Sequence, residues 1–365
     1  MTHLIELLTA AKPENQDVAK VIVWGGAQTL AQLPERSWLE KVNVIALNRG
    51  LLRRAWWQRF SLSRAAHAAG CSVLFVPGGS YAGNFRPMIT MSRNLLPFEW
   101  QELRRYAGSR TTFKLLLLRY IQSRSFRGAD GLIFLTEYAR QVVLKVTGQL
   151  AGKTITIPHG INPRFQIKRK DTHPSGEYTE SNPCRLLYVS IIDQYKHQWH
   201  VVEAVNALRS EGLSIVLDLV GPAYSPALAR LRAVLARRDP EGRWVHYHGA
   251  VPYEALHSIY EDADIGVFAS SCENMPNILL EAMAAGLPIA CSDRGPMPEV
   301  LGEAGIYFNP ELPASIAEAL RKLMFDAPLR AKLAGLAADK AKEYSWERCA
   351  RDTFTFVAKV AHRKL

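Results

Sequence analysis

The sequence predicts an α/β fold made of two doubly wound parallel sheets. Short apolar runs of strand length alternate with stretches of helical period along most of the 365 residues. The most regular unit lies between Asp264 and Asp293, where a strand, a loop, a helix and a second strand follow one another closely. A polar stretch at residues 168–183 divides the alternation into two halves. We therefore expect two domains, each with its own core.

The first half is expected to form a doubly wound domain over residues 1–165. It starts with the end of a helix at residues 4–10, and its strands are expected at residues 18–24, 43–47, 72–76, 87–91, 131–136 and 154–157. Residues 103–127 predict one long basic helical region. Such a domain normally opens with a strand and a Gly-rich turn, and neither precedes Thr2. We therefore expect that the first strand and its loop are missing and that the given start is truncated.

The second half is expected to form a similar domain over residues 166–345. Its strands are expected at residues 185–190, 215–220, 245–249, 265–269, 288–292 and 305–308, with helices between them. A last helix is expected to begin at Ser345, a residue type that caps helix N-termini. Residues 168–183, rich in Pro, Ser and Thr, are interpreted as an interdomain linker or an exposed loop.

The loop at residues 270–277 is the strongest candidate for a ligand site. It leaves the carboxyl end of an expected strand, where open parallel sheets bind ligands. The N–H groups near Met275, Pro276 and Asn277 point out of the N-terminus of the following helix and suit a phosphate or diphosphate. Pro276 costs little there, because a first-turn N–H has no intrahelical partner. The sequence therefore predicts an anion site built from backbone amides.

Two acids, Glu273 and Glu281, flank these amides. Glu281 lies about one turn inside the helix, roughly 6 Å along the axis from Asn277, which is too deep for a cap. A carboxylate beside phosphates repels them, so we expect both acids to accept hydrogen bonds from the hydroxyls of a sugar or a ribose. The alternative is that both are solvated surface acids, since Glu is seldom buried.

These residues carry a resemblance to a known family. E-N-M-P-N-I-L-L-E at residues 273–281, followed by A-M-A-A-G-L-P-I-A-C-S, resembles the E-x7-E signature of the retaining nucleotide-sugar glycosyltransferases of family 4, which have the GT-B fold. Similar segments are I-P-H-G-I-N-P-R-F at 157–165, L-L-Y-V-S at 186–190 with Lys196 after it, L-V-G-P at 219–222 and Y-E-D-A-D-I-G-V-F-A-S at 260–270. The resemblance covers residues from about 130 to 352 well.

The resemblance implies two Rossmann-like domains that face a central cleft. The first would take the acceptor, the second the nucleotide-sugar, and residues 346–365 would form a helix that returns to the first domain. Glu273 would contact the transferred sugar near the reaction centre, Glu281 the nucleotide ribose and Lys196 the diphosphate. The remaining substrate-binding residues would be Asn274, Met275, Pro276, Asn277 and Ile278.

The implied reaction transfers a sugar, with retention, from a UDP or GDP sugar to a glycan or a lipid-linked saccharide. The implied setting is bacterial surface-polysaccharide biosynthesis, such as O-antigen, capsule or exopolysaccharide.

No metal is expected. Asp262 and Asp264 form a D-x-D, but it precedes a strand rather than following one; His246 and His248 alternate on a strand, so that one is expected to face the core and the other solvent.

The chain departs from the family pattern at two substrate-binding positions. Ser190 and Ile191 stand where the family resemblance places Gly-Arg, so the usual diphosphate Arg is missing, and Arg294 or Arg93 is expected to replace its charge. Arg93-Asn94 stands where the family often has His-Asp or His-Asn. We expect Arg93 to act at the catalytic site; the alternative is that it merely follows a strand.

The net charge of +11 resides in the first half, where residues 1–160 hold 21 Lys and Arg against 9 Asp and Glu. Basic residues interleave with aromatic and Leu residues at 53–59 and 103–127. Such faces can lie on anionic lipid headgroups, so we expect peripheral contact with the inner face of the cytoplasmic membrane. The alternative is an ordinary domain helix with residues 115–121 inside.

Composition narrows the remaining possibilities. Five scattered cysteines without C-x-x-C fit a reducing cytoplasm, and neither an apolar stretch of 18 residues nor a signal peptide is present. Two other functions stay open: a GT-B nucleotide-sugar epimerase, and a non-catalytic polyanion-binding protein that uses the basic half. We expect no nucleic acid partner, because the acidic pair argues for sugar chemistry. The donor base, the sugar and the acceptor are not encoded by any pattern here.

Overall fold

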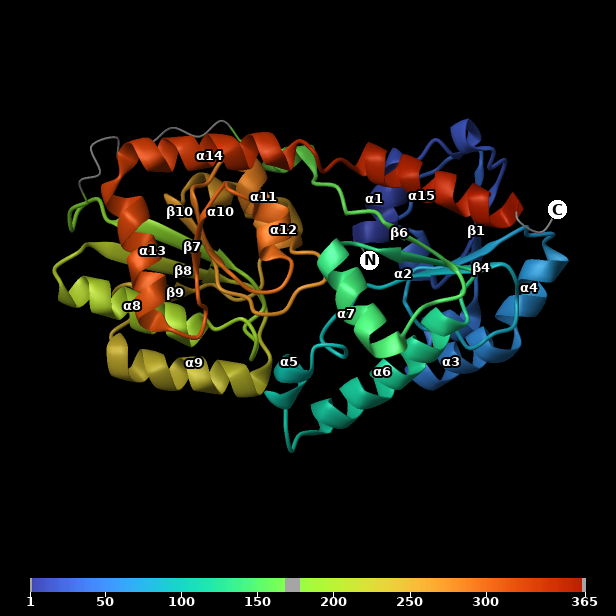
Figure 1. Ribbon diagram of the computed structural model, residues 1–365, viewed down its shortest axis with the longest axis horizontal. Helices are drawn as coiled ribbons and strands as arrows, with labels where there is room; N and C mark the ends of the chain where they lie inside the picture. The colour runs from blue at the N-terminus through green and yellow to red at the C-terminus, as the bar shows by residue number, and fades with distance from the viewer. Residues whose placement is uncertain (1, 168–177, 363–365) are drawn as a thin grey trace. The chain divides into compact units, whose positions relative to one another are not determined.

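The computed structural model describes residues 2–167 and 178–362 and divides the chain into two compact units (Figure 1). Unit 1 holds residues 1–99, 108–160 and 344–365, and unit 2 holds residues 100–107 and 161–343. The boundary between the units falls after residue 160, ahead of the stretch at residues 168–183 that the sequence analysis interprets as an interdomain linker or an exposed loop. Its residues 168–177 lie outside the described part of the chain, and Thr179 and Asn182 form a short antiparallel bridge.

Unit 1 contains two separate parallel sheets rather than one. β3 (Leu74–Val76), β4 (Met88–Met91), β5 (Gly131–Phe134) and β6 (Lys153–Thr156) form a four-stranded sheet in chain order. β1 (Val21–Gly25) and β2 (Leu39–Asn43) pair only with each other. The helices of the unit are α1 (Thr2–Ala10), α2 (Ala27–Leu30), α3 (Leu51–Phe60), α4 (Leu62–Ala68), α6 (Arg110–Arg127), α7 (Glu137–Thr147) and α15 (Trp346–Ala361), with short 3-10 turns η1 (Pro13–Gln16) and η2 (Ile45–Asn48).

Two of the expected elements in the first half are wrong. The strand expected at 43–47 ends at Asn43, and the apolar residues after it form η2. The expected long helical region at 103–127 is two helices, α5 (Trp100–Arg104) and α6, because Gly108 takes the left-handed region at φ 77° and Ser109 accepts a hydrogen bond from the Thr112 N–H as an N-cap.

The last helix, α15, packs on α1 and η1 of unit 1. Its N-cap is Ser345, whose hydroxyl accepts a hydrogen bond from the Arg348 N–H, as the sequence predicts. Its buried face includes Phe354, Phe356 and Val360. A Cβ at Gly131, the first residue of β5, would lie 2.9 Å from the Phe356 ring, so a residue without a side chain lets this helix approach the sheet.

Unit 2 is built on a six-stranded, fully parallel sheet in the order β12-β11-β10-β7-β8-β9. The strands are β7 (Cys184–Val189), β8 (Ile215–Val220), β9 (Val245–Tyr247), β10 (Ile265–Phe268), β11 (Ile289–Ser292) and β12 (Ile306–Phe308). This is the doubly wound order in which chain direction across the sheet reverses between the first and fourth strands, here β7 and β10. Ligands of such sheets bind beyond the carboxyl ends of these two strands.

Helices cover both faces of this sheet (Figure 1). α8 (Gln198–Ser210), α9 (Ser225–Arg238) and α13 (Pro313–Phe325) pack together on one face. α10 (Leu256–Glu261), α11 (Asn277–Ala284) and α12 (Met297–Leu301) lie on the other, with α14 (Ala327–Ala341) packed against α11. Strands covered on both faces read as continuous apolar runs, which is why the central strands β10 and β11 could be predicted from the sequence.

Candidate active site

The loops that follow β7 and β10 are held together by backbone contacts. The Ser271 N–H donates to the Tyr195 carbonyl at 2.8 Å. The neighbouring turn after β8 closes in as well, because Gly221 has φ 143° and a Cβ there would lie 2.2 Å from the Ser190 carbonyl oxygen. Only glycine allows both the conformation and the approach. The switch point of the sheet is therefore a tightly packed corner in which side chains from separate loops can meet.

Lys196 and Glu273 meet at this corner. The Lys196 ammonium forms an ion pair with the Glu273 carboxylate and lies 5.1 and 5.4 Å from the ring centres of Tyr195 and Phe268. Lys196 is 5% exposed, and its carbonyl accepts a hydrogen bond from the Tyr188 hydroxyl at 2.7 Å. A buried ammonium needs such partners, because its desolvation is otherwise uncompensated. The structure thus brings together two of the residues predicted from the sequence.

The N-terminus of α11 lies beside Glu273 in the chain. α11 begins at Asn277, and its N-cap Pro276 provides no side-chain cap. The Asn277 N–H donates to the Met275 carbonyl at 3.0 Å, so this amide is not directed at a ligand as expected. The other first-turn amides, from Ile278 onward, retain the positive end of the helix dipole. Asn274 and Met275, which the sequence also places at the site, are buried.

Glu281 points into the interior of unit 2. It is 3% exposed, and the Tyr260 hydroxyl donates to its Oε2 at 3.1 Å. Burial raises the pKa of Glu281 to about 7, while hydrogen bonds from Tyr260 and Tyr253 and the charge of Arg164 act in the opposite direction. The alternative that Glu281 is a solvated surface acid is therefore wrong.

The two arginines expected to supply charge lie in different units. Arg93 is exposed and follows β4 in unit 1. Arg294 follows β11 in unit 2, with its Nε 3.2 Å from Asp293 Oδ1. Gly295 beside it has φ 58°, and a Cβ there would lie 3.7 Å from the Ser271 carbonyl oxygen. The Arg294 turn is thus adjacent to the loop that carries Glu273.

The acids and histidines considered as metal ligands in the sequence lie away from the Lys196–Glu273 ion pair or bond to other residues. Asp264 accepts a hydrogen bond from the Arg185 N–H at 2.8 Å, at the amino ends of β10 and β7 and so at the opposite edge of the sheet from Lys196. His248 Nε2 and His246 Nδ1 lie 2.7 and 3.5 Å from Asp218 Oδ1, and both rings are almost half exposed. The expectation that one histidine faces the core is wrong. Within residues 2–167 and 178–362, no group of three or more His, Cys, Asp or Glu side chains is arranged so that it could hold a metal ion.

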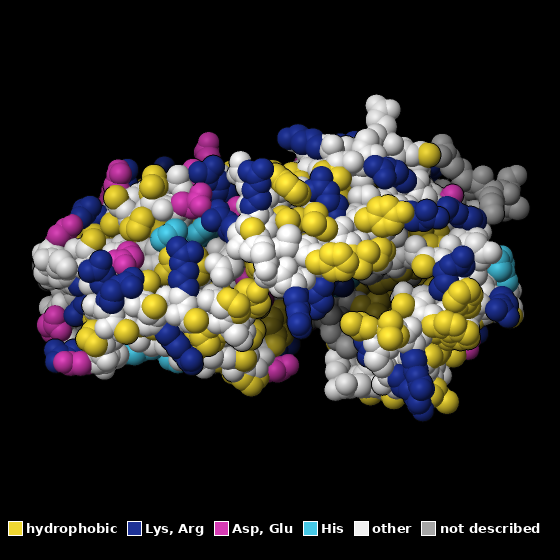
Figure 2. Space-filling model, turned by 90° about the horizontal axis from the view of Figure 1, so that it is seen from below, with side chains coloured by type: hydrophobic (Ala, Val, Ile, Leu, Met, Phe, Trp, Pro, Cys, Tyr) yellow, Lys and Arg dark blue, Asp and Glu magenta, His cyan; other side chains and the backbone are white. Residues whose placement is uncertain are grey.

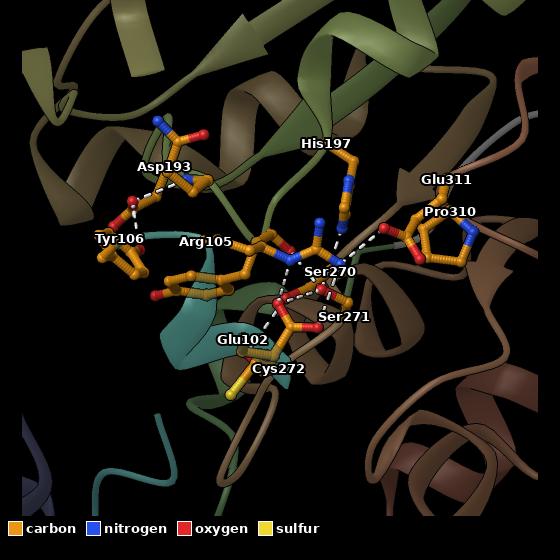
Figure 3. A network of polar contacts seen from close by, with 12 residues as sticks. Glu102, Arg105, Tyr106, Asp193, His197, Ser270, Ser271, Cys272, Pro310 and Glu311 are labelled. Carbon is orange, nitrogen blue, oxygen red and sulfur yellow. Dashed lines mark hydrogen bonds and ion pairs between the residues drawn. The ribbon is translucent and has the colours of Figure 1, made fainter. Parts of the chain in front are cut away.

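Sequence reasoning missed a polar network next to the ion pair (Figure 3). Glu102 from α5 accepts a hydrogen bond from the Ser271 hydroxyl at 2.8 Å, and Tyr106 donates to Asp193 at 2.6 Å. No local signal could have revealed these contacts, because they join residues 169 and 87 positions apart. Tyr260 could have been identified as a site residue from the sequence, since it lies in one of the segments that resemble the family.

Residues 183–326 match the family model described as glycosyl transferases, group 1. This match covers the β7–β12 sheet with Lys196, Glu273 and Glu281. Unit 2 contains a group 1 glycosyltransferase domain. The chain is 37% identical over 121 residues to O-antigen chain mannosyltransferase B of Escherichia coli, a match that covers 33% of this chain and 31% of that protein. The chain's matches span about a third of the length of the first curated relatives.

Solved structures resemble the chain beyond this glycosyltransferase domain. Sucrose-phosphate synthase from Thermosynechococcus elongatus superposes with a TM-score of 0.73 at 17% identity, covering 91% of this chain and 86% of that one. Anabaena Alr3699/HepE, solved with UDP and glucose, gives 0.68 at 14% identity, with 96% and 94% covered. At these identities the likeness shows the fold. The chain has the GT-B fold of two Rossmann-like domains that the sequence predicts.

Proposed function

We propose that the protein is a retaining glycosyltransferase that moves a sugar from a nucleotide-diphosphate sugar to a glycan or a lipid-linked saccharide in surface-polysaccharide synthesis. The observation that carries this proposal is the Lys196–Glu273 ion pair at the switch point, beside the N-terminus of α11. A cation, a helix N-terminus and an acid are what a diphosphate joined to a sugar requires. The O-antigen mannosyltransferase likeness supports the polysaccharide setting.

The donor would bind by exchanging partners at the ion pair. The diphosphate would draw the Lys196 ammonium away from Glu273 and add the first-turn amides of α11. Arg294 would supply the charge of the Arg that is replaced by Ile191. Glu281 would accept ribose hydroxyls, since a carboxylate can accept several hydrogen bonds beside those of Tyr260 and Tyr253. The UDP found in the structural neighbour Alr3699/HepE supports a nucleotide donor of UDP or GDP type.

The transfer would break the bond between the anomeric carbon and the diphosphate oxygen. The acceptor oxygen would form its bond to the same face of that carbon, and its proton would pass to the departing phosphate. Glu273, released from Lys196, would hold hydroxyls of the transferred sugar, and Arg93 would position the reacting groups. Fixed cations and amides stabilise the charge that develops on the leaving group. Transfer is therefore expected to continue in the presence of EDTA.

Unit 1, which would bind the acceptor, would contact an anionic membrane surface. α3 exposes Leu51, Leu52 and Trp56, and α6 exposes Phe113 and Tyr120, each more than half exposed. Lys and Arg side chains lie among the hydrophobic ones on the surface of unit 1 that Figure 2 shows. This combination of apolar and basic side chains suits the headgroup region of anionic lipid. Among the described residues, no helix has the length and hydropathy needed to span a bilayer.

A donor screen tests the proposed function. In a thermal-shift screen of UDP, GDP and ADP sugars, the sugars of one base should raise the melting temperature of the protein. That donor should be turned over only when a saccharide acceptor is added. NMR of the product should show that the anomeric configuration is retained. An epimerised donor without acceptor would instead establish the epimerase. Binding to polyanions with steep salt dependence and no stabilisation by any nucleotide-sugar would establish the non-catalytic alternative.

A further inference from the structure

Residues 100–107 pack within unit 2, although the residues on both sides of them belong to unit 1. This segment, here called the brace, consists of α5 and the turn after it. Its polar side chains reach the loops that follow β7, β10 and β12 (Figure 3). All three loops leave the carboxyl edge of the sheet, which is the edge that carries Lys196 and Glu273.

Glu102 is the centre of the brace. It is 6% exposed, and its carboxylate accepts hydrogen bonds from the Ser271 hydroxyl at 2.8 Å and from Arg105 Nε at 2.7 Å. Ser271 precedes Glu273 by two residues, and its oxygen also lies 3.0 Å from His197 Nε2. Burial lowers the pKa of His197 to about 3, so the ring is neutral and donates to Ser271 while Ser271 donates to Glu102. The loop that carries Glu273 is thus held by a chain of buried hydrogen bonds.

Arg105 and Tyr106 extend the brace to two more loops. Arg105 Nη2 donates to Glu311 Oε1 at 2.7 Å, beyond the end of β12. The buried Tyr106 hydroxyl donates to Asp193 Oδ1 at 2.6 Å. The Asp193 carbonyl in turn accepts from the Lys196 N–H at 3.1 Å, so Tyr106 fixes the turn that presents Lys196.

We propose that the brace positions the two loops that carry Lys196 and Glu273, and that Glu102, Arg105 and Tyr106 are positioning residues for nucleoside-diphosphate binding. The proposal rests on the proposed function, because it takes Lys196 and Glu273 as the donor-binding pair. The physical reason lies in burial: Glu102 and Tyr106 cannot leave their partners without stranding buried polar groups. Each loop is therefore confined to one conformation before any ligand arrives.

Four variants of the full-length protein test the brace, with hydrogen exchange of the ligand-free protein as the first readout. Glu102→Gln should raise exchange in peptides covering residues 269–275, and Tyr106→Phe in peptides covering residues 190–196, each by about tenfold because a buried hydrogen bond is lost. Arg105→Ala should raise exchange in peptides covering residues 269–275 and 309–312, because Arg105 donates to Glu102 and to Glu311. Arg104→Ala is the matched control, since this neighbouring arginine is exposed on the same helix and lies over the Trp100 ring of the brace itself.

The second readout is the affinity for UDP and GDP by calorimetry. We expect a loss of about fivefold or more in the three brace variants, on the scale of one lost hydrogen bond, and parental affinity in Arg104→Ala. If hydrogen exchange of both loops in the three brace variants equals that of the parent, the proposal is wrong. It is also wrong if exchange of the loops rises while the affinity for the nucleotide stays unchanged. If the parent binds neither nucleotide, the proposed function fails, and the exchange data alone then decide whether the segment holds the loops.

Discussion

Lys196 and Glu273 lie 77 residues apart in the chain and form a partly buried ion pair between the loops after β7 and β10. Each residue compensates the charge of the other in the ligand-free protein, which explains how a lysine that is 5% exposed can remain at this position. A diphosphate offers the ammonium a stronger partner and frees the carboxylate for sugar hydroxyls. The pair is therefore poised for exchange, and the predictions below follow from it and from its surroundings.

Glu273→Gln should lower turnover by about a hundredfold or more, the scale of one lost electrostatic contact in the transition state. The donor KM should change by less than about threefold, because the diphosphate contacts remain. Steady-state kinetics with the donor identified by thermal shift measures both values. Glu254→Gln, an exposed acid of the same unit, is the control and should behave like the parent. Equal turnover of the Glu273 variant and the parent would remove Glu273 from the reaction centre.

Glu281 should make stability fall as pH rises. Its folded pKa is raised from an ordinary 4.5 to about 7, so between these values the folded state binds more protons than the unfolded state. The contribution is fully present below pH 4.5 and lost by pH 7. Glu281→Gln removes it, and the variant should gain about 2 to 3 kcal/mol on the parent between pH 5 and pH 8. Urea unfolding at the two pH values measures this; a difference that does not change with pH contradicts it.

Tyr260→Phe should destabilise the protein by about 1 to 3 kcal/mol, the cost of leaving a buried acceptor unsatisfied. The lost donor is the hydroxyl that bonds Glu281, so the pKa of that carboxyl should rise further. Affinity for the nucleotide at pH 7.5 should fall as more of the carboxyl becomes protonated. Chemical unfolding and calorimetry measure the two effects. Tyr120→Phe, on the exposed face of α6, serves as control. If both variants unfold with the same free energy as the parent, the hydrogen bond of Tyr260 does not stabilise the protein.

Trp56→Ser combined with Phe113→Ser should abolish most binding to vesicles of anionic phospholipid. Each side chain is more than half exposed on a basic helix, and burial of such apolar area adds to the electrostatic attraction. Cosedimentation at low and high salt measures the loss; parental binding should also decrease as salt rises. Phe325→Ser, an equally exposed residue of unit 2, is the control. Retained binding of the double variant would place the membrane contact elsewhere.

The second half of the fold could be predicted because its central strands β10 and β11 are fully buried and read as plain apolar runs. The strand at 43–47 could not, since apolar residues 44–47 follow the strand in a tight turn rather than extending it. The residues of the E-x7-E segment were visible as a local motif. The burial of Glu281 was not, because it depends on Tyr260, 21 residues earlier. The brace was hidden for the same reason: its helix packs on loops far along the chain, and helix periodicity says nothing about distant partners.

Calorimetric titration of UDP and GDP into the parent, Lys196→Met and Lys332→Met tests the central claim most directly. Lys332 is an exposed lysine of unit 2 and controls for the loss of one charge. The account predicts that the parent and the Lys332 variant bind one of the two nucleotides with equal affinity and that the Lys196 variant loses at least about tenfold, the equivalent of 1.4 kcal/mol. Equal affinity in all three proteins would contradict it.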